Sequence, residues 1–143
     1  MLKNVPGIIS TKLISVLNDM GHGDEIVIGD GNFPGIDIAK RVVYASGHGV
    51  PELLKAILQL IPLDEYVEKP VSLMATTEYF EGVPPIWAEY EKIIKDSDEK
   101  ERFTEFEFVE RFEYYERAKK AFAIIVTSER ALFANIIIKK GVI

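Results

Sequence analysis

The chain has 143 residues, a formal net charge of −6 and 48% hydrophobic residues. This length and composition predict one domain with a sizeable core. Because 23 acidic side chains outnumber 17 basic ones without a long basic run, we expect no nucleic-acid partner. The lack of cysteine excludes disulfides, thiolate nucleophiles and cysteine-ligated zinc.

The hydropathy pattern bears on the location of the protein. The N-terminal residues lack the apolar segment of a signal peptide, and no apolar run approaches the roughly 20 residues that span a bilayer. We therefore expect a cytoplasmic protein without a membrane partner.

The predicted elements alternate between helices and strands along the chain. Helical spacing predicts a helix over residues 10–20, and the apolar run Ile26-Val27-Ile28 predicts a strand over 25–29 that is buried on both faces. A strand over 41–44, a helix over 51–61, a strand over 71–76 and a helix over 85–95 follow. The last elements are a strand over 106–109, a helix over 111–120 and β-branched strands over 121–127 and 134–139. We expect a single α/β domain over residues 1–143, layered α/β/α with a mixed, largely parallel sheet.

Three basic side chains are the first candidates for chemistry. His22 lies between two glycines, and histidine is the usual proton carrier near neutral pH. The alternative is a solvated turn histidine without function, and the residues alone leave both interpretations open. His48 also lies between glycines and is the weaker candidate. Arg111 opens a charged helix that would ordinarily be a salt-bridged surface.

Asp30 ends the predicted strand over 25–29 and begins a loop rich in glycine. Ligands of α/β folds usually bind at the C-terminal ends of strands. Asp30 could cap the turn at Gly31, which the residues favour, or it could hold sugar hydroxyls as an ionised acceptor. A phosphate loop is not expected, because an aspartate repels phosphate and Pro34 has no N–H. The neighbouring acidic residues match no metal-binding loop.

Four stretches carry specific motifs in a fixed order. They are Met20-Gly21-His22-Gly23-Asp24-Glu25 leading into Asp30-Gly31-Asn32-Phe33-Pro34, Pro62-Leu63-Asp64-Glu65-Tyr66, Arg111-Phe112-Glu113-Tyr114-Tyr115-Glu116-Arg117-Ala118, and Ser128-Glu129-Arg130-Ala131-Leu132-Phe133-Ala134-Asn135. Together they resemble the family that contains L-fucose mutarotase and D-ribose pyranase, over nearly the whole chain. The His-Gly-Asp-Glu form and the helix around Arg111 resemble its fucose branch more than its ribose branch.

The resemblance implies a sugar mutarotase, an isomerase that interconverts the α and β anomers of L-fucose or a similar monosaccharide by acid/base ring opening and closure. No cofactor and no metal are needed. It makes His22 the catalytic proton-transfer group, and Asp64 becomes a weak candidate that either assists proton transfer or fixes local structure. The implied substrate-binding residues are Asp30, Arg111, Phe133, Ala134 and Asn135.

The resemblance has one departure and several rival functions. The family usually has tyrosine at the position of Phe133, so a phenolic O–H is missing, which can weaken sugar binding by about 1 kcal/mol; Tyr114 or Tyr115 could replace it. The expected partners are a free monosaccharide and further copies of this chain, in a ring-shaped homo-oligomer such as a decamer. The rivals are D-ribose pyranase-type activity, a non-catalytic monosaccharide-binding module and a purely structural protein.

The predicted strand over 25–29 creates a geometric problem for the implied site. At about 3.3 Å per residue, an extended segment places His22 and Asp30 at opposite ends, too far apart to meet around one small sugar. Either the strand is shorter, or the chain bends, or the site is shared between subunits.

Overall fold

A six-stranded sheet forms the middle layer of the computed structural model, which describes residues 1–143. Its strands are β1 (Glu25–Gly29), β2 (Val42–Ala45), β3 (Val71–Met74), β4 (Glu107–Val109), β5 (Ala123–Thr127) and β6 (Ile136–Lys139), in the spatial order β2-β5-β1-β6-β3-β4. The pairs β2–β5, β5–β1 and β3–β4 are parallel, whereas β6 is antiparallel to both β1 and β3. The predicted mixed, largely parallel sheet is confirmed.

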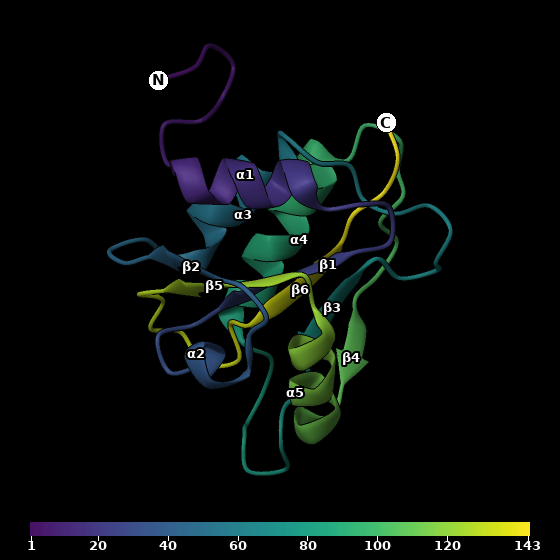
Figure 1. Cartoon of the computed structure of the whole chain (residues 1–143). Coiled ribbons are helices and arrows are strands. Elements are labelled where there is room, and N and C mark those ends of the chain that lie inside the picture. The colour runs from purple at the N-terminus through teal and green to yellow at the C-terminus, as the bar shows by residue number, and fades with distance from the viewer.

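Helices cover both faces of this sheet (Figure 1). The helices α1 (Thr11–Asp19), α3 (Val50–Leu58) and α4 (Pro85–Ser97) lie on one face, and α2 (Gly35–Ile38) and α5 (Arg111–Lys120) lie on the other. Because successive strand residues point to opposite faces, Ile26 and Ile28 pack with the first group of helices while Val27 packs with α5. β1 is therefore buried on both faces, as its sequence predicts.

The boundaries differ from the predicted ones where the backbone has other hydrogen-bond partners. α3 ends at Leu58 because the N–H groups of Leu60 and Ile61 both turn back to the carbonyl of Ile57. β6 begins at Ile136, two residues later than expected. The helix α2 was not predicted, because four residues are too few for a visible period. No helix has the length and apolar character needed to cross a membrane.

The strand directions give the sheet two different ends. The Asp30 end is where β1 and β4 finish and β6 starts, so it carries Asp30 after β1, Arg111 after β4 and Asn135 before β6. The His22 end lies opposite, where β1 starts and β6 finishes. Here the N–H of Gly23 donates to the carbonyl of Lys140.

Candidate functional site

The loop after β1 is fixed by hydrogen bonds around Asp30. The Asp30 N–H donates to Asn135 Oδ1 at 2.7 Å, and the Asn32 N–H donates to Asp30 Oδ1 at 2.9 Å. Both Asp30 and Asn135 are buried, with exposed fractions of 8% and 6%. The predicted turn-capping role of Asp30 is thus confirmed, and the structure brings Asp30 and Asn135 together from positions 105 residues apart.

The surroundings of the Asp30 carboxyl group oppose its ionisation. Burial raises its pKa above the ordinary value of 3.8, and nearby Glu129 raises it further. Hydrogen bonds from the backbone of Asn32 and Phe33 and from the side chain of Asn135 only partly offset this effect. No cation pairs with this carboxyl group, and buried groups with perturbed pKa values are concentrated at functional sites.

The loop before β6 is held by α4. Trp87 Nε1 donates to the carbonyl of Phe133 at 2.8 Å, and the Tyr90 hydroxyl donates to the carbonyl of Ala134 at 2.7 Å. Phe133 has a left-handed backbone with φ 54°, which is uncommon for a bulky residue and is concentrated at functional sites. Ala134 is fully buried, and its carbonyl already accepts the Tyr90 hydroxyl.

The two donors on α4, Trp87 and Tyr90, fix the loop before β6, and the sequence analysis did not single them out. The available signal was chemical, because a buried indole N–H or phenol O–H usually finds an acceptor. Their partners could not be named before the fold was known.

Arg111 lies near this site without bonding to Asp30. Its Nε donates to the Tyr115 hydroxyl at 3.2 Å, and its guanidinium is exposed to solvent. The Tyr115 ring lies 5.7 Å from the ring of Phe33, which follows Asp30 in the loop. The salt-bridged face of α5 belongs to Arg117 instead, which pairs with Glu25 and Glu107. Tyr114 is fully buried, and its hydroxyl has no partner.

His22 and Asp64 form a hydrogen-bonded pair at the His22 end. His22 Nε2 lies 3.0 Å from Asp64 Oδ1, and the side chains are 46% and 3% exposed. Asp64 Oδ1 also accepts the Tyr66 N–H at 3.2 Å, and the Tyr66 ring lies 5.0 Å from the imidazole. An ionised carboxylate can only accept, so the neutral imidazole carries its hydrogen on Nε2. This leaves Nδ1 with the lone pair that can exchange a proton.

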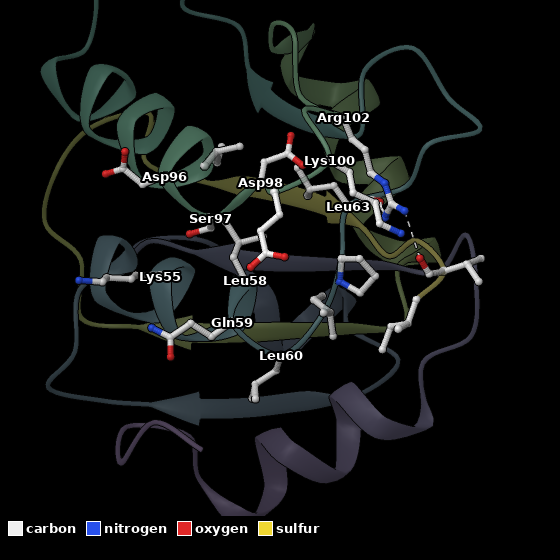
Figure 2. A pocket seen from close by; sticks show the side chains of 16 residues that line it. Lys55, Leu58, Gln59, Leu60, Leu63, Asp96, Ser97, Asp98, Lys100 and Arg102 are labelled. Carbon is white, nitrogen blue, oxygen red and sulfur yellow. Dashed lines mark hydrogen bonds between the residues drawn. The ribbon is translucent and has the colours of Figure 1, made fainter. Parts of the chain in front are cut away.

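One chain therefore contains two separate groups of predicted site residues. The five-residue strand β1 stands between His22 and Asp30, a span of roughly 15 Å or more. The strand has the predicted length, so the explanation by a shorter strand is wrong. A cavity of about 630 Å³ lies elsewhere, with Leu63 and Arg102 in its lining and without any of these site residues (Figure 2).

The comparisons with known proteins agree with this arrangement of elements. The human fucose mutarotase is 45% identical over 148 residues, which cover 99% of this chain and 94% of that protein. The fucose mutarotase of Streptococcus pneumoniae, solved in complex with L-fucose, has a TM-score of 0.92 and 41% identity over 99% of both chains. FucU from Bifidobacterium longum has a TM-score of 0.92 and 46% identity, again over 99% of both chains. Residues 3–143 match the RbsD / FucU transport protein family, and the chain therefore belongs to this family.

Proposed function

We propose that this protein is an isomerase that interconverts the α and β anomers of a free monosaccharide, L-fucose or a similar deoxyhexose. The observation that carries the proposal is the match over 99% of both chains to a fucose mutarotase that was solved with L-fucose bound. The Asp30 end offers oriented polar groups, and His22 offers a half-exposed imidazole. The proposal places the enzyme in the cytoplasm, and cell fractionation tests that location.

The proposed reaction opens and recloses the sugar ring. His22 Nδ1 takes the proton of the anomeric hydroxyl, the bond between the anomeric carbon and the ring oxygen breaks, and the ring oxygen receives a proton from the medium. The open-chain aldehyde rotates and closes on its other face, with each proton returned. Such positioned acid/base groups typically accelerate a reaction by about 10²–10⁴-fold.

The sugar hydroxyls would bind at the Asp30 end. The Asp30 carboxylate already accepts hydrogen bonds from Asn32, Phe33 and Asn135, and a sugar hydroxyl would donate to a remaining lone pair. Arg111 supplies donors from the start of α5, and the Asn135 N–H₂, which already donates to the Asp30 carboxyl group, has a second hydrogen for the sugar. Phe133 offers a ring for stacking on an apolar sugar face, and Ala134 shapes the site through the carbonyl that the Tyr90 hydroxyl binds.

Since His22 and Asp30 are separated within one chain, the proposal includes a site shared between neighbouring copies in a ring-shaped homo-oligomer. In a head-to-tail ring, His22 of one copy faces the Asp30 end of the next. Co-expressed His22→Ala and Asn135→Ala chains, each inactive alone, should then regain activity. Random 1:1 mixing gives about one quarter of the junctions an intact His22 and an intact Asn135. Folded mixed rings without any activity would contradict a shared site.

The main test is saturation-transfer NMR of anomeric exchange with L-fucose, and with D-ribose and D-galactose in parallel. We expect exchange on L-fucose above the buffer rate, abolished by His22→Ala. His48→Ala is the matched control, because His48 also lies between glycines and bonds only a surface glutamate, Glu52. Preferred turnover of D-ribose would point to pyranase-type activity. Binding without exchange would leave a monosaccharide-binding module.

A further inference from the structure

Arg102 is a buried charge whose position has no explanation in the proposed reaction. Its side chain is 5% exposed, and it lies in the connector between α4 and β4. Figure 2 shows it in the lining of the cavity, close to Leu63 and Lys100. Burying a guanidinium is costly unless its N–H groups are bonded, so the partners of Arg102 indicate what it does.

Those partners are mainly backbone carbonyls from two distant segments. Arg102 Nη1 donates to the Leu63 carbonyl at 2.6 Å, and Nη2 donates to the Val142 carbonyl at 3.3 Å. The only carboxylate in reach is Glu65, at 3.5 Å and 46% exposed, and Nε has no partner. The guanidinium therefore joins two chain segments rather than forming a strong ion pair.

The first of these segments, residues 62–65, carries the partner of His22. Its backbone also pairs with the extension of β6, because the Asp64 N–H donates to the Lys139 carbonyl and the Gly141 N–H donates to the Pro62 carbonyl. The fit is close, since a side chain at Gly141 would overlap the Leu63 carbonyl at 2.2 Å. Arg102 therefore holds the carbonyl of Leu63 in place. The residue after Leu63 is Asp64, which lies within hydrogen-bond distance of His22.

His22 depends on this support because it has little packing of its own. It lies in a glycine-flanked turn and is half exposed, and its ring contacts only Asp64 and Tyr66 in the interactions described above. Both contacts come from residues that closely follow Leu63, whose carbonyl Arg102 binds. A shift of Asp64 would release the imidazole and let the neutral ring exchange its hydrogen between Nε2 and Nδ1.

We propose that Arg102 is a positioning residue for the acid/base group: by joining Leu63 to the extension of β6, it holds Asp64 against His22 and keeps Nδ1 free to exchange protons. This inference rests on the proposed function. It assigns a role to a residue 80 positions away from His22 in the sequence, outside the motifs that identified the family.

The test compares Arg102→Met and Arg102→Lys with the matched control Arg41→Met. Arg41 also donates from Nη1 to a backbone carbonyl, that of Phe122, at 3.1 Å, but it makes no contact with His22, Asp64 or Tyr66. The first readout is the ¹⁵N NMR spectrum of the two histidine rings, in which His48 serves as the internal reference. The second readout is kcat and KM for anomeric exchange, measured on proteins whose folding is verified by circular dichroism.

We expect wild-type His22 to show the Nε2–H form and Arg102→Met to show a mixture of both forms, with the His48 signals unchanged. The kcat should fall by about tenfold, within the contribution of a positioned acid/base group, while KM stays constant because the Asp30 end is intact. Arg102→Lys cannot bridge both carbonyls, so its kcat should lie between those of the wild type and Arg102→Met. It also provides the test if Arg102→Met does not fold. Arg41→Met should match the wild type.

An unchanged His22 ring spectrum and kcat in a folded Arg102 variant would overturn the inference. A rise of KM by about tenfold with constant kcat would also overturn the inference, because that result assigns Arg102 to sugar binding. If the wild type itself shows no anomeric exchange, the proposed function fails. The ring spectrum still decides whether Arg102 fixes the His22–Asp64 pair.

Discussion

The two ends of the sheet are built in different ways. At the Asp30 end, buried side chains hold each other and the backbone before any ligand arrives. At the His22 end, the half-exposed imidazole is bonded to one buried carboxylate, that of Asp64. The segment around Asp64 is held by backbone hydrogen bonds to the extension of β6. A rigid, dehydrated end suits recognition of sugar hydroxyls, whereas an accessible imidazole suits exchange of protons with the medium. The comparison suggests that substrate affinity and turnover can be changed independently.

The largest expected effect is that of Asp64→Asn on turnover. If the asparagine amide N–H₂ turns toward His22, it donates to Nε2 and moves the ring hydrogen to Nδ1. We expect kcat to fall by about 100-fold with little change in KM, measured by saturation-transfer NMR. A rise in KM as large as the fall in kcat would show that the two ends are not independent.

The next effect is that of Asp30→Asn on affinity. Losing a charged acceptor for a sugar hydroxyl should raise KM by about tenfold or more, since such bonds contribute roughly 1.5–3 kcal/mol. The asparagine oxygen can still accept the Asn32 N–H, so the loop should keep its shape. Isothermal titration with L-fucose measures the loss, and unchanged affinity would remove Asp30 from the proposed site.

The same variant makes a prediction about stability and pH. Because the folded-state pKa of Asp30 is raised above 3.8, its stabilising contribution is complete below the unfolded-state pKa and is lost as pH rises through the folded-state pKa. Asp30→Asn should therefore unfold at a higher temperature than wild type at pH 7, and the difference should shrink toward pH 4. A variant that is less stable than wild type at pH 7 would contradict a raised pKa.

A smaller effect is expected for Phe133→Tyr. Adding a phenolic O–H, which the family resemblance implies at this position, should add one hydrogen bond, about 1 kcal/mol, or roughly a fivefold gain in kcat/KM on L-fucose. The aromatic contact with Phe80, at 5.0 Å between ring centres, should persist. No gain in kcat/KM would mean that another group, such as the Tyr115 hydroxyl, already makes this hydrogen bond to the sugar.

The smallest effect concerns Tyr114, which bears on neither end directly. Its hydroxyl is buried without a partner, whereas the Tyr90 hydroxyl is bonded to Ala134. Tyr114→Phe should leave activity unchanged and raise the free energy of unfolding slightly, by up to about 1 kcal/mol, because an unpaired buried hydroxyl is removed. Tyr90→Phe is the matched control and should destabilise the protein in urea unfolding. Equal effects of both variants would argue that Tyr114 is also bonded.

The sequence predicts the elements well because their signals are local. The apolar run of β1, the β-branched run of β5 and the boundaries of α5 all follow from neighbouring residues. The position of antiparallel β6 between β1 and β3 depends on contacts between distant residues and was not predictable. For the same reason His22 could be nominated, but its bond to Asp64, 42 residues away, could not be assigned. The separation of His22 from Asp30 was foreseeable, because it follows from strand geometry alone.

The contacts of Lys140 have a consequence for how the molecule reaches its native state. Lys140 Nζ donates to the carbonyls of Leu17 and Met20, which lie 123 and 120 positions earlier. Closing a flexible loop of this length has an entropic cost of about 4 kcal/mol, so these contacts should form late in folding, after the local helices. The bond between the Asp30 N–H and Asn135 closes a loop of 105 residues, so both ends of the sheet should become native-like at a similarly late stage of refolding.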